Sequence, residues 1–206
     1  MTSFEASGWL QKFMNYDLGF MNKEIIICPS FTLLPNLKSY ILDHKSAAKV
    51  GGQNISPFDE GAYTGEVNGR EIKEFADYVI VGHSERRMNF SEDFGMLEKK
   101  VALAKKYNLT PIFCVQGKET QVPEGIEIIA YEPIDAIGTG HPDTPKNADD
   151  VASFFKINQK GKYVLYGGSV TSNNVQGFTQ MANLDGVLVG KGSLDPLEFL
   201  QIIKNA

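Results

Sequence analysis

The stretch from Tyr78 to Arg87, Tyr-Val-Ile-Val-Gly-His-Ser-Glu-Arg-Arg, joins a short apolar run to a cluster of polar and charged side chains. Runs of this kind, rich in β-branched residues, are typical of buried parallel strands. Six similar runs occur along the chain, so the sequence predicts seven strands, at residues 25–28, 49–52, 78–82, 111–115, 127–131, 163–167 and 186–190.

Segments with helical spacing lie between most of these runs. The clearest are residues 4–14, 94–107, 148–155 and 195–203. Strands that alternate with helices predict an α/β fold with a parallel sheet. No shift in composition marks a boundary, so we expect one domain over residues 1–206.

The composition excludes several classes of protein. Of the 206 residues, 42% are hydrophobic and 22% are charged, which argues against a disordered or fibrous chain. The net charge of −5, without a basic block, argues against nucleic-acid or anionic-membrane partners. No apolar stretch approaches the roughly 18–20 residues that cross a bilayer, and the N-terminus lacks a signal-peptide pattern, so we expect a cytoplasmic protein.

The two cysteines do not form a disulfide framework. Cys28 and Cys114 each end or interrupt an apolar run. Buried thiols in strands are therefore expected, rather than catalytic ones.

Polar residues follow four of the predicted strands. His83 and Glu132 each follow one strand, and Gly/Ser turns at 167–169 and 190–193 follow two others. Because α/β enzymes place their sites at the carboxyl ends of strands, these groups are expected at one edge.

The chemistry of this set is that of a proton shift next to a carbonyl. A carboxylate can remove the proton while an imidazole polarises the carbonyl oxygen. Glycine-rich turns offer backbone amides to a phosphate. Each feature also has a plainer interpretation: the histidine as a helix cap or core residue, the glutamate as the partner of an arginine, and Gly-Gly-Ser as a simple turn.

Several long motifs together resemble the triosephosphate isomerase family. They are Val81–Arg87, Ala130–Pro133 with Ala136–Gly140, Tyr166–Val170 and Leu188–Gly190, in the family's order and spacing. The resemblance implies a (β/α)8 barrel, shortened here to seven recognisable strands. It also implies the interconversion of dihydroxyacetone phosphate and glyceraldehyde 3-phosphate in glycolysis and gluconeogenesis, without a metal or organic cofactor.

The resemblance also implies roles for single residues. Glu132 matches the base that shuttles the proton, and His83 matches the neutral imidazole that polarises the carbonyl. Tyr166 matches the residue that latches the closed lid over the site. Glu85 matches a carboxylate that normally pairs with a lysine absent here, so we expect it to turn to an arginine.

Further matches concern the phosphate and a second subunit. Gly138 in the lid, Ser169, and the backbone amides of Gly190 and Lys191 match the phosphate grip. Residues 51–67 resemble a long loop that docks into a second copy of the chain, with Thr64 reaching towards the partner's site. A homodimer is therefore expected.

The most serious departure from the family is at the start. The family opens with a strand that ends in Asn-x-Lys, whereas the first helical pattern here begins at Ser3. A start codon assigned too late and a real truncation are both open explanations. The alternative function is therefore a catalytically impaired or inactive barrel fragment. A further alternative is a phosphate-binding barrel with different chemistry.

Other departures are smaller. Lys191 replaces a common glycine, and one hypothesis is that it partly restores the missing positive charge. Asp135 and residues 141–143 replace the usual hinges of the lid. The ten residues 116–125 are too few for the fifth helix, so a bare patch, covered by this link or by a partner, is expected beside strands 111–115 and 127–131.

Overall fold

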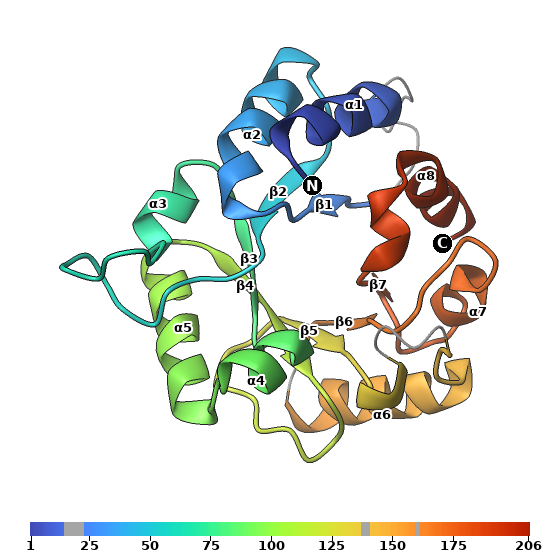
Figure 1. Ribbon diagram of the computed structural model, residues 1–206. Helices are drawn as coiled ribbons and strands as arrows, with labels where there is room; N and C mark the ends of the chain where they lie inside the picture. Colours follow the sequence, from blue (N-terminus) through green and yellow to red (C-terminus); the bar gives the residue numbers. More distant parts are fainter. Residues whose placement is uncertain (15–22, 137–140, 160) are drawn as a thin grey trace. The chain divides into compact units, whose positions relative to one another are not determined.

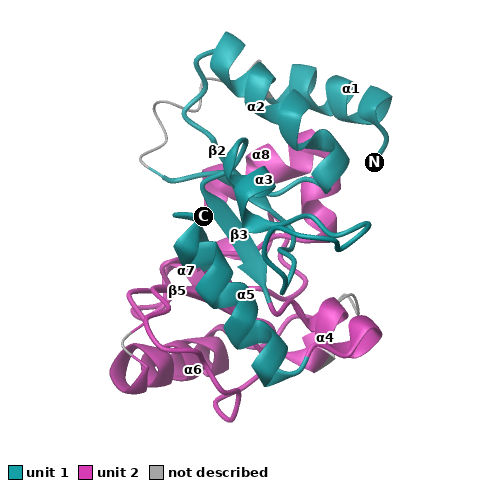
Figure 2. Ribbon diagram, turned by 90° about the vertical axis from the view of Figure 1, so that its left-hand side faces the viewer, with its two compact units in different colours: residues 1–81, 93–111 teal, residues 82–92, 112–206 magenta. Residues whose placement is uncertain are grey.

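The computed structural model describes residues 1–14, 23–136, 141–159 and 161–206. These residues form two compact units, coloured separately in Figure 2. The first unit contains residues 1–81 and 93–111, and the second contains residues 82–92 and 112–206. The single domain expected from the sequence stays a prediction.

The first unit is built on three short parallel strands. Ile26 of β1 lies opposite Lys49 of β2, and Gly51 of β2 lies opposite Tyr78 of β3. A side chain at Gly51 would not fit, because its Cβ would lie 2.6 Å from the sulfur of Cys28. The elements are α1 (Ser3–Met14), β1 (Ile26–Ile27), η1 (Phe31–Leu33), α2 (Leu34–Asp43), β2 (Lys49–Gly52), α3 (Gly69–Lys73), β3 (Tyr78–Val81) and α5 (Phe94–Lys106).

The second unit continues the strand–helix alternation. Its strands β4 to β7 pair in parallel in sequence order, with Val115 of β4 opposite Tyr131 of β5 and Tyr131 opposite Tyr166 of β6. The elements are α4 (Ser84–Phe90), β4 (Thr110–Val115, from Ile112 in this unit), β5 (Ile128–Tyr131), η2 (Ile134–Ala136), α6 (Pro145–Asn158), β6 (Tyr163–Tyr166), α7 (Val175–Thr179), β7 (Gly186–Val187), η3 (Lys191–Leu194) and α8 (Pro196–Asn205).

The core of the second unit lies between strands and helices. Helix α6 packs against β5 and β6 (Figure 1), and its buried residues recur every three or four positions, as on one face of a helix. Phe155 of this face and Ile129 of β5 are fully buried. Tyr166 of β6 is also fully buried, and its ring stacks on Phe178 of α7 at 3.9 Å between centroids. The carboxyl ends of β5 and β6 are therefore firmly packed.

All seven predicted strands are present; three, β3, β5 and β6, are one residue shorter than predicted, and two are shorter by more. Strands β1 and β7 have two residues each. Pro29 follows closely after β1, and proline lacks the N–H that would continue the ladder. Cys28 consequently lies one residue beyond the strand, so its predicted place in a strand is wrong. Its thiol is nevertheless desolvated, because burial raises the pKa of Cys28 to about 12, although the residue as a whole is partly exposed. For Cys114 the prediction of a buried strand thiol is confirmed.

The four predicted helices are present as α1, α5, α6 and α8, and four others were not predicted. Helices α3, α4 and α7 have five to seven residues, too few to repeat an apolar period. Helix α2 is long enough, and its buried Leu34, Leu37 and Ile41 do show helical spacing. No helix of the described residues is long and apolar enough to cross a membrane.

The link between β4 and β5 has no helix, as the sequence predicts. Residues 116–127 form turns, in which the Thr120 hydroxyl accepts hydrogen bonds from the N–H groups of Gln116 and Gly117. No bare patch results, because almost all of β4 and β5 is buried. Pro123 and Ile126 of the link are buried too, which agrees with the expected alternative that the link covers these strands.

Two isoleucines of the second unit test the packing. Ile129 is fully buried and Ile157 is 75% exposed. We expect Ile129→Ala to lower the free energy of unfolding by about 2–5 kcal/mol, because it removes buried methyl groups and leaves a cavity. Ile157→Ala should change it by less than about 0.5 kcal/mol. Equal effects in urea unfolding would contradict the packing described for β5.

Candidate active site

Glu132 lies directly beyond β5, with its side chain inside the protein. Its backbone N–H donates to the Val115 carbonyl at 2.8 Å, which extends the pairing of β4 and β5 by one residue. The residue is 2% exposed. Room for the side chain comes from Gly167, where a Cβ would lie 3.1 Å from Glu132 Cγ. The end of β6 thus leaves space for the carboxylate that the end of β5 carries.

His83 lies at the N-terminus of α4 and meets this carboxylate. Its Nε2 is 2.9 Å from Glu132 Oε1. Its Nδ1 accepts a hydrogen bond of 3.3 Å from the N–H of Glu85, as a helix N-cap does. An accepting Nδ1 carries no proton, so the neutral ring has its proton on Nε2 and donates it to Glu132. Of the two plainer roles, the structure supports the helix cap and not the core residue, because the side chain is 27% exposed. Capping is compatible with the catalytic role, because it fixes the tautomer.

Ser84 completes the contacts of the carboxylate. Its N–H and its hydroxyl donate to Glu132 Oε2 at 3.0 and 2.9 Å. Ser84 was quoted in the sequence motif but was not predicted as a site residue. Its position after His83 gives the available signal, because the first N–H groups of a helix have no partner within the helix. With these donors, the cost of burying a carboxylate is offset.

The electrostatics of the pair favour the protonated imidazole. Burial lowers the pKa of His83, but the hydrogen bond and charge of Glu132, with the charge of Glu85, outweigh it and raise the pKa above its usual value. Above this raised pKa the pair is a neutral imidazole donating to a carboxylate. Below it the pair is an imidazolium–carboxylate ion pair.

Glu85 points to His83 rather than to an arginine. Its carboxylate lies 4.0 Å from His83 Nδ1. Arg86 pairs instead with Glu92 at 2.6 Å, and Arg87 donates to the carbonyls of Gly82 and Cys114. The arginines therefore hold α4 in place, and Glu85 adds negative charge beside the imidazole.

The predicted phosphate-binding turns lie at the ends of β6 and β7. Ser169 has a left-handed backbone, with φ 48°, and its hydroxyl donates to the Ala136 carbonyl at 2.7 Å. Gly190 and Lys191 are exposed at the start of η3. A Cβ at Gly192 would lie 3.1 Å from the carbonyl of Val170, so the two turns lie side by side.

Tyr166, predicted as a latch, is buried and accepts a hydrogen bond from the N–H of Asp143 at 2.8 Å.

Gly138 lies outside the described residues, and of Asp135 only the backbone, within η2, is described. Among the described residues there is no group of three or more His, Cys, Asp or Glu side chains that could hold a metal ion.

Thr64 belongs to the first unit, in an exposed loop that extends beyond α3 (Figure 1). The loop is closed by a hydrogen bond from the Ser56 N–H to the Val67 carbonyl at 3.0 Å. Next to Thr64, Tyr63 stacks on Phe58 at 4.4 Å, and the two rings are 45% and 43% exposed.

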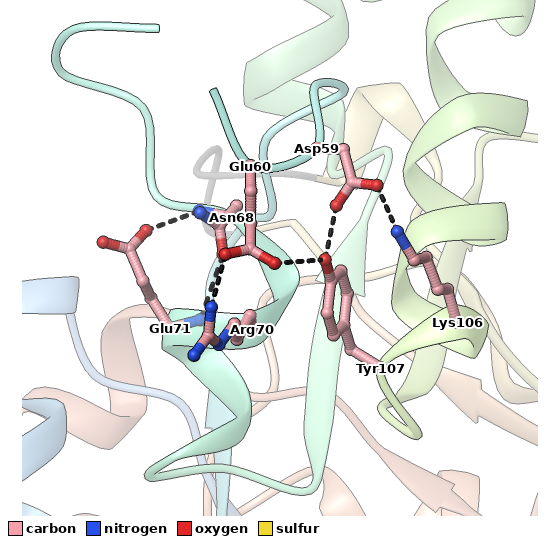
Figure 3. Close-up of polar contacts among 7 residues, drawn as sticks. All are labelled: Asp59, Glu60, Asn68, Arg70, Glu71, Lys106 and Tyr107. Atoms are coloured by element: carbon pink, nitrogen blue, oxygen red, sulfur yellow. Dashed lines mark hydrogen bonds and ion pairs between the residues drawn. The ribbon is translucent and has the colours of Figure 1, made fainter. Parts of the chain in front are cut away.

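Two acidic residues anchor this loop to α3 and the end of α5 (Figure 3). Asp59 accepts hydrogen bonds from Lys106 and from the hydroxyl of Tyr107, and Glu60 pairs with Arg70 at 2.5 Å. These contacts hold the pKa of Asp59 at about 2, with the Lys106 hydrogen bond as the largest cause. The carboxylate therefore stays charged at neutral pH, and the loop presents its exposed rings from a fixed base.

Comparisons with known proteins point to one family. The family model described as triosephosphate isomerase matches residues 1–206. The triosephosphate isomerase of Dictyoglomus thermophilum is 38% identical over 238 residues, covering 99% of this chain and 94% of that protein. That of Mesomycoplasma hyopneumoniae (strain 232) is 36% identical over 233 residues, covering 100% and 95%.

The His83–Glu132 pair predicts how stability depends on pH. Because the pKa of His83 is raised in the folded protein, the folded state binds this proton more tightly than the unfolded state. The stabilisation is complete below the ordinary pKa of about 6.5 and is lost as pH rises through the raised value. In urea unfolding between pH 6 and 9, the wild type should lose stability relative to Glu132→Gln, which lacks the charge. The compared quantity is the free energy of unfolding of the wild type minus that of Glu132→Gln. If this quantity stayed constant or rose with pH, the pairing would be contradicted.

Proposed function

The chain belongs to the triosephosphate isomerase family and is an isomerase, and we propose that Glu132 and His83 carry its reaction. The reaction interconverts dihydroxyacetone phosphate and glyceraldehyde 3-phosphate. The observation that supports these roles is the 2.9 Å contact between the buried Glu132 carboxylate and His83 Nε2. This contact puts a base and a hydrogen-bond donor within reach of one small substrate.

The proposed reaction moves one proton between neighbouring carbons. Glu132 takes the proton from the carbon beside the carbonyl, and the C–H electrons form the carbon–carbon double bond of an enediolate. His83 donates its Nε2–H to the oxygen on which charge develops. After proton transfer between the oxygens, Glu132 returns its proton to the neighbouring carbon. Before the reaction, Glu132 has to leave its donors, which frees the His83 N–H for the substrate.

The remaining site residues are proposed to bind and position the substrate. Ser169 and the amides of Gly190 and Lys191, on turns that lie side by side, suit a phosphate, with Gly138 as a further contact. Lys191 would add positive charge there. Glu85 supports His83, and Tyr166 supports the segment that contains Asp143. The setting is proposed to be glycolysis and gluconeogenesis in the cytoplasm, and residues 1–206 to form one barrel domain.

The rival interpretations are less well supported. Relatives that cover 99–100% of this chain are named as the enzyme, which does not favour an impaired fragment. A phosphate-binding barrel with other chemistry would not need Glu132 and His83 in contact.

A homodimer through residues 51–67 is also part of the proposal. The loop carries two exposed, stacked aromatic rings on an anchored base, and aromatic anchors are typical of the centres of protein interfaces. Thr64, beside them, would reach the site of the second copy.

The role of Glu132 is tested by Glu132→Gln. We expect kcat to fall by about 10²–10⁴-fold, because an amide does not accept the proton, while the protein still folds. The matched control is Glu127→Gln at an exposed residue whose carboxylate lies 3.8 Å from Lys162, and it should keep the wild-type rate. An assay with glyceraldehyde 3-phosphate measures both. Turnover by Glu132→Gln at the wild-type rate, or folded wild type without turnover, would refute the proposal.

The role of the loop is tested by Tyr63→Asp. A charge at an aromatic anchor should weaken the dimer about thirtyfold or more, as seen in sedimentation across protein concentrations. Leu42→Asp, which alters an exposed apolar residue on α2, is the control and should leave the dimer intact. A monomeric wild type, or an unchanged dimer in Tyr63→Asp, would overturn this part of the proposal.

A further inference from the structure

Three segments of the second unit converge on Asp143, which lies just before α6. The hydroxyl of Tyr131, the last residue of β5, donates to Asp143 Oδ2 at 3.1 Å. The side-chain amide of Asn147 donates to the same oxygen at 2.7 Å. The backbone N–H of Asp143 donates to the hydroxyl oxygen of Tyr166, the last residue of β6, at 2.8 Å. One residue thus contacts the carboxyl ends of two neighbouring strands.

The hydroxyl groups of Tyr131 and Tyr166 are shielded from water. Tyr131 is 4% exposed and Tyr166 is fully buried, so their hydroxyls need protein partners. Burial, as the largest cause, together with the charge of Asp143, raises the pKa of Tyr131 above its usual value. Burial likewise raises the pKa of Tyr166 to about 12. Both hydroxyls therefore keep their protons, and Tyr131 acts as the donor to Asp143.

Capping of α6 does not account for the whole arrangement. Thr144 is the N-cap residue, and its hydroxyl accepts from the Asn147 N–H. Asp143 supports this turn through Oδ1, which accepts from the Thr144 N–H at 2.7 Å. The contact of Oδ2 with Tyr131 is additional to the cap and reaches into the sheet.

The two strand ends are those that carry the reaction. Tyr131 directly precedes Glu132, and Tyr166 directly precedes Gly167, whose missing side chain leaves room for Glu132. Ser169 follows two residues later. A link between Tyr131 and Tyr166 therefore fixes the base relative to the turn proposed to bind phosphate.

We propose that Asp143 is a positioning residue of the reaction, which holds Glu132 in register with the turn at residues 167–169 by joining Tyr131 to Tyr166. This inference rests on the proposed function of Glu132. Asp143 touches neither the substrate nor the reacting atoms in this account. It acts through the two tyrosines.

The test compares four variants by kcat and KM with glyceraldehyde 3-phosphate. Asp143→Ala should lower kcat about tenfold and leave KM within about twofold, because a displaced base slows proton transfer more than it weakens binding. Asp143→Asn keeps an acceptor oxygen for Tyr131 and should stay within about threefold of the wild type. Tyr131→Phe should match Asp143→Ala, and the double variant should be no slower than either single variant.

Asp149→Ala is the matched control for a merely structural effect. Asp149 lies within α6, six residues after Asp143, is half-buried, and accepts two hydrogen bonds from Asn183, at 2.7 and 3.0 Å. Its loss should lower stability and leave kcat unchanged. A wild-type kcat in Asp143→Ala, an equal loss in Asp149→Ala, no rescue by Asp143→Asn, or additive effects of the Tyr131 and Asp143 changes would each overturn the inference.

Failure of the proposed function gives a different result. Wild type without turnover refutes that function and the positioning role together. The Tyr131–Asp143 contact is then measured by the same double-variant comparison in the unfolding equilibrium. If the Tyr131 and Asp143 changes have non-additive effects on the free energy of unfolding, the contact is real and only the proposed function is wrong. If their effects are additive, the contact itself is wrong.

Discussion

The buried carboxylate of Glu132 is the constraint on which the second unit depends. A charge with 2% exposure is tolerable only when donors surround it, and the imidazole of His83 with the N–H and hydroxyl of Ser84 supply them. The start of α4, the end of β5 and the glycine after β6 are therefore fixed relative to one another. Changing any of the three leaves a buried charge with poorer partners or with no room.

The same contacts prepare the chemistry. Because the Glu85 N–H occupies Nδ1, the neutral ring of His83 carries its proton on Nε2, where it can serve first the carboxylate and then a substrate oxygen. Both Glu132 oxygens accept hydrogen bonds in the free protein, so the proposed reaction includes an exchange of these protein donors for the substrate. Asp143 joins the ends of β5 and β6 through its contacts with Tyr131 and Tyr166, and this link is the basis of its proposed positioning role.

The sequence predicted the meeting of His83 and Glu132 because each follows a parallel strand, and the carboxyl ends of such strands share one edge. The seven strands followed from their apolar runs, although Pro29 shortened β1 and moved Cys28 out of it. Helices α3, α4 and α7 were not predicted, because helices of five to seven residues are too short to show a repeating pattern of apolar residues. The role of Ser84 could not be predicted, because it depends on the direction in which α4 begins. The role of Asp143 could not be predicted either, because its partners Tyr131 and Tyr166 lie 12 residues before it and 23 residues after it in the sequence.

The tautomer of His83 reports on its pairing with Glu132. The chain has three histidines, so the imidazole nitrogens can be assigned by ¹⁵N NMR with the help of His44→Asn and His141→Asn. At alkaline pH, we expect a neutral His83 with its proton on Nε2 in the wild type. This proton should exchange with solvent faster in Glu132→Gln, where the hydrogen bond is weaker. A proton on Nδ1, or an Nε2 proton whose exchange does not depend on Glu132, would show that the carboxylate and the imidazole do not hold each other in the free protein.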